Sequence, residues 1–130
     1  MSQYREPRKL NPEEAAQRQV VEYLQLSAPP SLIWYACPNG GHSKGQNGRN
    51  KALGVLPGVP DLHFVLDGNR IAYIEMKAPK GVLSEAQKTF KAVCVLRGSP
   101  WALCRSVDEV EAALRSWGVP LKATLGRRAA

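Results

Sequence analysis

The sequence lacks the features that would direct it to a membrane or to an oxidising compartment. No apolar run in its 130 residues approaches membrane-spanning length, and residues 1–9 lack the apolar stretch of a secretory signal. The three cysteines, Cys37, Cys94 and Cys104, are widely spaced, and no Cys-x-x-Cys or paired-histidine spacing occurs. They are predicted to be buried, reduced thiols and not a zinc site or a disulfide framework. We therefore expect a cytoplasmic protein.

Acidic residues are few, with 11 Asp and Glu against 18 Lys and Arg and a net charge of +7. This excess favours a polyanionic partner, although charge alone does not choose between DNA, RNA and an acidic membrane. The chain has no internal repeat, no ATP-binding loop and no helix-turn-helix signature, so specificity for a nucleic acid should rest on its shape. Its length suits one domain over residues 1–130, with residues 1–10 and 121–130 as loose basic tails.

Capping patterns mark three helices along the chain. Helix starts are predicted at Asn11-Pro12, at Ser84 with Gln87 three residues later, and at Ser106, again with a side-chain acceptor in the first turn. The remaining pattern predicts strands over residues 32–37 and 101–105 and a hairpin over 58–77, with a long Gly- and Asn-rich segment over 38–57 that holds one helical turn near 49–53. The predicted order is αβββαβα, an α/β fold.

The hairpin carries charged residues where buried strands should have none. If Asp67, Gly68 and Asn69 form a three-residue loop, the antiparallel ladder places Asp61 opposite Glu75, with both carboxylates on one face. Alternation puts Lys77 on that face too, together with His63 and Tyr73, and it sends the apolar residues to the other face. Two carboxylates and a neighbouring ammonium are typical of a site for a hard divalent cation that acts on phosphate.

Loop length decides between this interpretation and a plainer one. A two-residue Asp67-Gly68 turn would shift the pairing by one and send the two carboxylates to opposite faces. The plainer alternative is an ordinary hairpin in which Asp61 belongs to a Pro-Asp turn and Glu75 and Lys77 lie on a solvated face. Short carboxylate motifs recur by chance, so the spacing alone leaves both possibilities open.

Three blocks of sequence occur together in this chain: Gly58-Val59-Pro60-Asp61-Leu62, Ile74-Glu75-Met76-Lys77 and Lys80-Gly81-Val82-Leu83-Ser84-Glu85-Ala86-Gln87. With this spacing they resemble one known family, the virus-type replication-repair nuclease (VRR-NUC) domains of the PD-(D/E)xK nuclease superfamily, and Asn39-Gly40-Gly41 is similar to a further loop of that family. The resemblance implies a restriction-endonuclease-like core, in which a mixed central sheet is flanked by helices.

The resemblance also implies roles for named residues. Asp61, Glu75 and the backbone carbonyl of Met76 would hold one or two Mg²⁺ or Mn²⁺ ions, and Lys77 would orient the attacking water. The family pattern of a glutamate ahead of an apolar helix stripe aligns with Glu13. Its neighbour Glu14, at the third helical position, has the separate task of completing a capping box.

Two further assignments keep an alternative beside them. Gln87 is either the capping partner of Ser84 or, as the resemblance implies, an active-site glutamine close to Lys77. Lys44, Arg49 and Lys51 in the long segment are predicted to contact DNA phosphates, although exposed basic residues are often only solvated surface.

The resemblance, together with these residues, implies a Mg²⁺- or Mn²⁺-dependent endonuclease that hydrolyses phosphodiester bonds in structured or branched DNA, of which a four-way (Holliday) junction resolvase is one form. The alternatives are a non-catalytic nucleic-acid-binding module and an RNA-directed nuclease of the same fold. Because one centre cuts one strand, paired cuts in a junction require two centres, which predicts a homodimer. A lone domain of this size suggests a phage or bacterial source by analogy, with a phage-encoded protein acting in the host cytoplasm.

Overall fold

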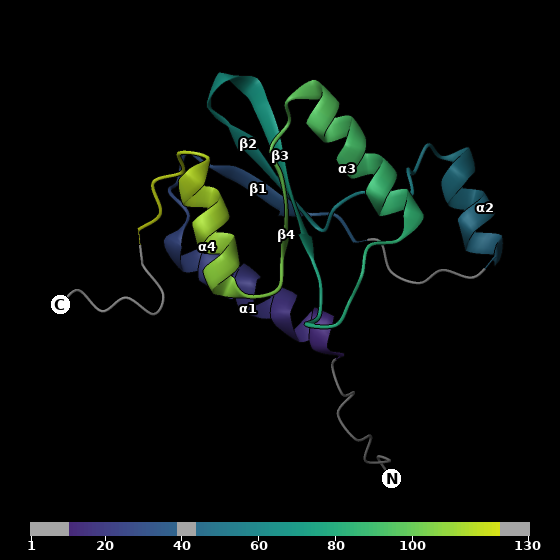
Figure 1. The fold of residues 1–130 in the computed structure, drawn as a ribbon, viewed down its shortest axis with the longest axis horizontal. Coiled ribbons are helices and arrows are strands. Elements are labelled where there is room, and N and C mark those ends of the chain that lie inside the picture. Colours follow the sequence, from purple (N-terminus) through teal and green to yellow (C-terminus); the bar gives the residue numbers. More distant parts are fainter. Residues whose placement is uncertain (1–10, 39–43, 123–130) are drawn as a thin grey trace, which may run out of the picture.

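The computed structural model describes residues 11–38 and 44–122, and for residues 44–47 it describes the backbone only. These residues form four helices and a four-stranded sheet (Figure 1). The elements in chain order are α1 (Pro12–Ser27), β1 (Ile33–Ala36), α2 (Lys44–Ala52), β2 (Leu62–Leu66), the 3₁₀ turn η1 (Asp67–Asn69), β3 (Arg70–Met76), α3 (Glu85–Arg97), β4 (Trp101–Cys104) and α4 (Val107–Ser116).

The sheet is mixed, as expected. Its strand order is β1-β2-β3-β4, with antiparallel pairing from β1 to β3 and parallel pairing of β3 with β4. Helix α3 makes the crossover that a parallel pair requires.

One prediction was wrong: residues 44–52 form a nine-residue helix where a single helical turn in a loop was expected. This segment contains Gly45 and Gly48 and few apolar residues, which explains why neither propensity nor periodicity revealed it.

The hairpin has the three-residue loop that is required to place Asp61 and Glu75 on one face of the sheet. Leu66 pairs with Arg70 and Leu62 with Ile74, so the ladder points Asp61 toward Glu75 one step beyond its last pair. Gly68 and Asn69 both adopt positive φ angles, 77° and 59°, which glycine and asparagine tolerate best. The two-residue turn is therefore excluded.

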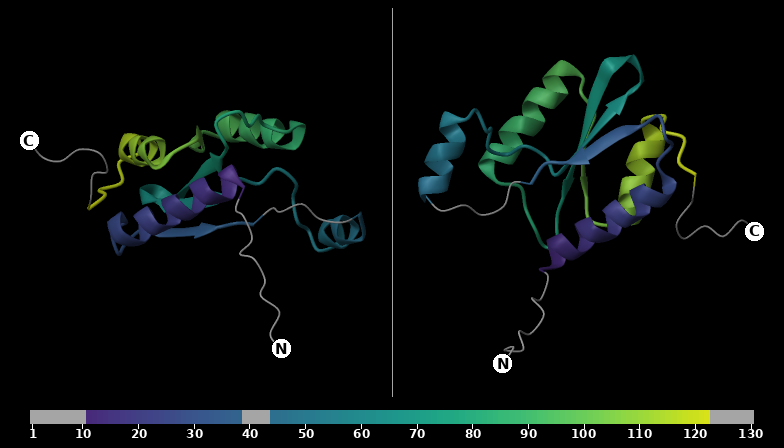
Figure 2. Two further views of the ribbon diagram at one scale, coloured as in Figure 1. Left: turned by 90° about the horizontal axis from the view of Figure 1, so that it is seen from below. Right: turned by 180° about the vertical axis from the view of Figure 1, so that it is seen from behind.

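The apolar face of the sheet packs against α1 and α4, which form one layer of the molecule (Figure 2). Fully buried side chains from the sheet and from both helices interdigitate in this core, among them Val20, Leu24, Leu62, Phe64, Ile74, Met76, Val110 and Leu114. A polar contact crosses the core where the Tyr23 hydroxyl donates to Glu111 Oε2 at 2.7 Å. Burial, followed by that carboxylate, raises the pKa of Tyr23 to about 12.

The predicted caps are present, but the C-terminal boundary differs from the prediction. Asn11 and Ser106 accept the expected backbone N–H groups, and Gly98 closes α3 in the left-handed conformation. Leu121, which the sequence places in a loose tail, is instead buried in the core, and the N–H of Lys122 donates to Ser27 O at 2.7 Å. Leu121 and Lys122 thus pack against the core and the C-terminal end of α1.

The three cysteines are free thiols that differ in their burial. Cys94 and Cys104 are buried free thiols, whereas Cys37 is only half-buried. Burial raises the pKa of the Cys104 thiol to about 12, so this group is a protonated core residue at neutral pH. Among the residues that the structure describes, no helix is long and apolar enough to cross a membrane.

Candidate metal centre

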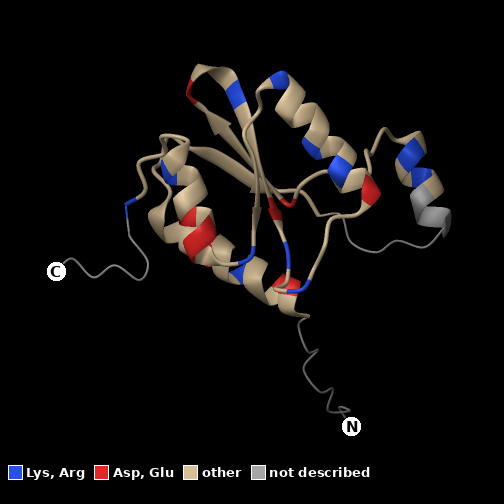
Figure 3. Cartoon of the chain, viewed as in Figure 1, with Lys and Arg blue, Asp and Glu red and all other residues tan. Residues whose placement is uncertain are grey.

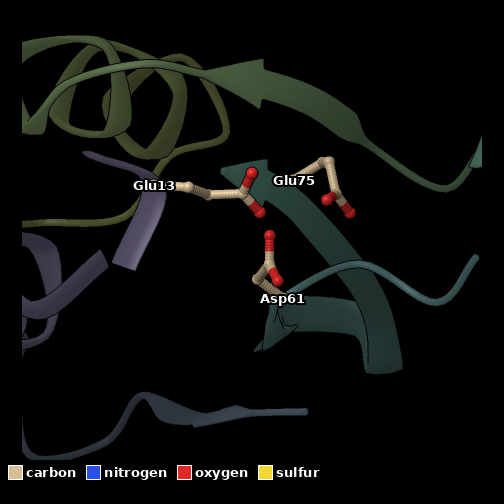
Figure 4. Close-up of side chains that lie close together, drawn as sticks. All are labelled: Glu13, Asp61 and Glu75. Carbon is tan, nitrogen blue, oxygen red and sulfur yellow. The ribbon is translucent and has the colours of Figure 1, made fainter. Parts of the chain in front are cut away.

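Three carboxylates from separate elements meet at one end of the sheet (Figure 4). Glu13 comes from the first turn of α1, Asp61 from the residue before β2, and Glu75 from the penultimate position of β3. One carboxylate oxygen of each lies within 4.8 Å of the corresponding oxygens of the other two. The structure therefore brings together the two carboxylates expected from the register and the helix glutamate expected from the resemblance.

Local structure explains how the three side chains reach this point. Helix α1 begins at Pro12, and Glu13 in its first turn points its carboxylate toward Asp61 and Glu75 (Figure 4). Pro60 is buried before the strand, and Asp61 Oδ2 accepts the N–H of Met76 at 2.8 Å, which ties the start of β2 to the end of β3. This hydrogen bond, from a backbone N–H to a side-chain carboxylate, holds Asp61 next to the residue that follows Glu75.

Glu75 is the most buried of the three, with only 2% of its surface exposed. Its Oε1 accepts a hydrogen bond from Gln87 Nε2 at 2.9 Å and lies 3.9 Å from Lys77 Nζ. Its Oε2 is also buried and has no hydrogen-bond partner among the described residues. A buried carboxylate oxygen without a donor is costly, so this atom needs either a proton or a cation.

The electrostatics of Glu75 point the same way. Burial, followed by the negative charge of Asp61, raises the pKa of Glu75 to about 9, and the charge of Lys77 opposes this shift. Two carboxyl groups that are close enough to share a proton are also close enough to share a divalent ion. The unpaired Oε2 atom and the raised pKa thus have a common origin: Glu75 is buried beside a second carboxylate, with little positive charge nearby.

Gln87 makes the predicted cap contacts and also reaches the carboxylates, while an active-site role for it stays a prediction. Its Oε1 accepts the N–H of Ser84 at 2.8 Å while its own N–H donates to Ser84 Oγ at 3.2 Å, which completes the capping box of α3. Its Nε2 at the same time donates to Glu75 Oε1. The cap orients the amide so that its only donor group faces the carboxylate, and the two contacts support each other.

Lys77 lies beside the carboxylates, as alternation predicted. It is 9% exposed, and its backbone N–H donates to Cys104 O at 3.0 Å, so its stem is enclosed while its ammonium faces Glu75. Alternation also placed His63 and Tyr73 on this face, and their rings are in contact, with centroids 4.9 Å apart. His63 contacts Pro60 O and the Tyr35 hydroxyl, and burial lowers its pKa.

The donor set fits a hard divalent cation. Three carboxylates supply only oxygen ligands, which suit Mg²⁺ or Mn²⁺ better than the softer ions that bind thiolate or imidazole. Ligand oxygens around Mg²⁺ are about 3–4 Å apart, since each lies about 2.1 Å from the ion, so small side-chain shifts would close this group around one ion. Glu13, Asp61 and Glu75 would hold the cation. The backbone carbonyl of Met76 stays a predicted ligand, because only the amide of this residue has a described contact at the site.

The three predicted DNA-binding residues all belong to α2, at a distance from the carboxylates along the chain. Arg49 and Lys51 are exposed in its last turn, whereas the side chain of Lys44 lies outside the described residues, as do Asn39, Gly40 and Gly41. The structure therefore places two of these residues on the surface, and their contact with phosphate stays a prediction.

Two residues shape the site without having been predicted to do so. Arg105 donates from its side chain to backbone carbonyls in the turn after Lys77. Gly58 has φ +81°, and a Cβ added there would lie 2.4 Å from the backbone of Ala86. Gly58 lies in a block that carried the resemblance, whereas no motif or periodicity singles out Arg105, since its role depends on a turn 24 to 27 residues earlier in the chain.

Comparisons with known proteins agree with this fold. The family model of the VRR-NUC domain matches residues 5–108. A solved structure described as a VRR-NUC domain superposes with a TM-score of 0.54 at 17% identity, and the match covers 83% of this chain and 99% of that one. At this identity the likeness concerns the fold alone. A search of the curated proteins gave no match.

Proposed function

This chain belongs to the VRR-NUC family, whose fold is of the nuclease type, and we propose that it is a divalent-metal-dependent endonuclease that hydrolyses phosphodiester bonds in DNA. The observation that carries the proposal is the group of three carboxylates, in which Glu75 is buried and Glu13 and Asp61 are half-buried, with an unpartnered Glu75 oxygen and the Lys77 ammonium beside it. A structural role alone does not account for three carboxylates so close together in a partly buried place.

Each residue has a distinct task in the proposed reaction. When bound, Mg²⁺ or Mn²⁺ would polarise the phosphate and make water a better nucleophile at neutral pH. Asp61, Glu75 and Glu13 would hold the ion, and Gln87 would keep Glu75 in its orientation. Lys77 cannot ligate a metal as an ammonium, so it would donate hydrogen bonds that orient the water and stabilise the charge developing on the phosphate. No covalent intermediate is required.

The distribution of charge supports a nucleic acid as substrate (Figure 3). Helices α2 and α3 carry six basic residues and one acidic residue, and the N-terminus of α3 bears Gln87, which contacts the carboxylates. A DNA backbone that lies along these helices would be led toward the metal centre. Lys44, Arg49 and Lys51 of α2 would contact phosphates on either side of the cut.

The direct test is a cleavage assay on matched DNA and RNA substrates with Mg²⁺, Mn²⁺ or EDTA. We expect cleavage of DNA with either metal and none with EDTA. Lys77→Met should keep DNA and metal binding while losing most cleavage, and Asp61→Asn should lose metal affinity as well. Full activity of Lys77→Met, or cleavage of RNA alone, would contradict the proposal.

We further propose that the protein cuts four-way junctions as a homodimer. The described residues present one carboxylate centre, and two symmetric cuts require two centres related by a two-fold axis. Exposed apolar side chains support an interface, because Leu56 and Val93 line a hollow beside α3 and Leu96, on the same helix, is 80% exposed.

Light scattering at micromolar concentration tests the dimer separately from the chemistry. The expected mass is twice the 14.3 kDa of one chain. Val93→Asp, inside the hollow, should shift the mass toward the monomer and replace paired cuts with single nicks, while Val82→Asp, at an exposed position outside the hollow, serves as the control. A wild-type monomer, with and without junction DNA, would leave a nickase or a flap endonuclease as the better description.

A further inference from the structure

Arg105 follows β4 directly and binds the turn that comes after Lys77. Its Nη1 atom donates to three backbone carbonyls, those of Ala78, Pro79 at 3.1 Å and Gly81 at 3.0 Å. The turn is closed in addition by the N–H of Gly81, which donates to Ala78 O at 2.9 Å. Three carbonyl oxygens that converge on one point repel each other unless a donor lies between them, and the guanidinium supplies that donor.

The same turn is in contact with the stem of Lys77. A Cβ added at Gly81 would lie 3.3 Å from Lys77 Cδ, so the turn passes close to this side chain and an added methyl group would have to displace it by a few tenths of an ångström. The backbone of Lys77 is fixed from the same side, because its N–H donates to the carbonyl of Cys104, the residue before Arg105. The end of β4 therefore determines the position of both the main chain and the side chain of Lys77.

We propose that Arg105 is a positioning residue for Lys77, a proposal that rests on the nuclease function proposed above. By gathering the carbonyls of the 78–81 turn, Arg105 presses Gly81 against the lysine stem and keeps the ammonium beside Glu75. A direct contact of Arg105 with phosphate is less consistent with the structure, since its Nη1 is already shared among three acceptors. Arg105 is itself half-buried, and its N–H donates to Glu109 Oε2 at 3.1 Å, which anchors it to α4.

Arg105→Met tests this proposal, because methionine fills part of the same space without a donor. We expect kcat to fall about 10- to 100-fold, since a catalytic group displaced by about 1 Å costs up to about that factor, while KM and Mn²⁺ affinity stay within about twofold of wild type. Arg105→Lys should recover part of kcat, because an ammonium can reach some of the carbonyls. Arg70→Met is the matched control, as it removes an exposed arginine at the opposite end of β3.

The possible results separate positioning from other roles. An unchanged kcat in Arg105→Met would overturn the proposal, and so would a raised KM with a weaker salt dependence, which would identify a phosphate contact. If Arg105→Met does not fold, Arg105→Lys and Gly81→Ala decide. Gly81→Ala leaves the guanidinium intact and crowds the lysine stem directly, so wild-type kcat in both variants would also overturn the proposal.

A readout without catalysis keeps this test distinct from that of the proposed function. The ¹³Cε and ¹H signals of Lys77 in the metal-free protein should shift in Arg105→Met and stay in place in Arg70→Met. If the wild type cleaves no DNA, the nuclease proposal fails, but the lysine signals still report whether Arg105 positions this side chain. Unshifted signals in Arg105→Met would overturn the positioning role by themselves.

Discussion

Helices α3 and α4 begin alike, each with a serine cap, yet they differ in what they bury. Helix α4 buries Val107, Val110, Glu111 and Leu114, whereas α3 buries only Cys94 and leaves Leu96 and its neighbours exposed. One helix belongs to the core, and the other covers the face of the sheet on which the carboxylates lie. Packing holds α4 in place, while α3 has an open surface on which a ligand or a second chain can bind.

Helices α1 and α4 also differ in charge from helices α2 and α3. Helices α1 and α4 carry six acidic residues and two basic ones, the acidic ones being Glu13, Glu14, Glu22, Asp108, Glu109 and Glu111. Helices α2 and α3 show the reverse, with basic residues Lys44, Arg49, Lys51, Lys88, Lys91 and Arg97 and one acidic residue, Glu85. We call these the acidic side and the basic side. The carboxylate group lies where they meet, since Glu13 comes from one side and Gln87, which contacts Glu75, from the other.

The largest expected effect separates chemistry from packing. Asp61→Asn should lower DNA cleavage by at least about 10³-fold, because the carboxylate is removed while the fold is kept. Tyr23→Phe on the acidic side removes the hydroxyl that donates to Glu111 and should reduce stability by about 1–3 kcal/mol with little effect on cleavage. Cleavage rates and thermal melts of the two variants check this contrast, and equal losses of activity would break it.

A second prediction concerns the contact between α3 and the segment before β2. Gly58→Ala should destabilise the protein by about 2–5 kcal/mol, because φ is +81° and the new methyl would lie 2.4 Å from Ala86 backbone. Gly68→Ala has a similar φ of +77° with nothing within 4 Å, so it should cost only about 1 kcal/mol. The free energies of unfolding of both variants in urea separate the two effects, because Gly68→Ala reports the backbone strain alone and Gly58→Ala reports the strain together with the clash. Equal losses of stability would mean that α3 is free to move away from this segment.

The pH dependence of stability follows from the raised pKa of Glu75. Without metal, the folded protein keeps a proton on Glu75 up to about pH 9, whereas the unfolded chain releases it near 4.5. Folding therefore binds a proton between these values, and stability should fall as pH rises from about 5 to 9. Glu75→Gln should remove most of this slope and gain roughly 1–3 kcal/mol at pH 8, although it abolishes cleavage. Melts in EDTA across this range measure the effect, and parallel curves for the two proteins would contradict it.

The sequence was sufficient to predict the features that depend on local rules. Caps at Asn11, Ser84 and Ser106 fixed the helix starts, and the loop of Asp67, Gly68 and Asn69 fixed the register that unites Asp61 with Glu75. Glu13 could be placed because the family pattern of a glutamate ahead of an apolar helix stripe aligns with it. Each of these inferences involves a few neighbouring residues or a single ladder.

Features that depend on distant contacts could not be predicted in this way. The helix over residues 44–52 lacks an apolar stripe, and the hydrogen bonds of Arg105 join segments that only the parallel pairing of β3 and β4 brings together. The two contacts of Gln87, with Ser84 and with Glu75, appeared as alternatives because the sequence shows the helix cap but not where the NH₂ group of the side chain points. Tertiary geometry combines what the sequence presented as alternatives.

The smallest effect concerns the basic side as a surface for DNA. Replacing Arg49 and Lys51 by methionine should lower the log-log salt slope of DNA binding by about 1.8, or about 0.9 for each phosphate that the protein no longer neutralises. Arg18 and Arg115 on the acidic side form the matched control, because each pairs with a glutamate four residues earlier, at 3.5 Å. Fluorescence anisotropy over a series of salt concentrations gives both slopes. An equal decrease of the slope in the control pair would mean that DNA does not distinguish the two sides.

A calorimetric titration with Mn²⁺ shows whether Glu13, Asp61 and Glu75 form a divalent-cation site. Because the cation would displace the proton held at Glu75, wild-type protein at pH 7.5 should bind Mn²⁺ and release about one proton, detectable as a binding enthalpy that changes with the buffer. Glu75→Gln should bind Mn²⁺ much more weakly and release no proton, while Glu85→Gln on the exposed start of α3 should match wild type. Equal Mn²⁺ affinity in wild type and Glu75→Gln would contradict the account.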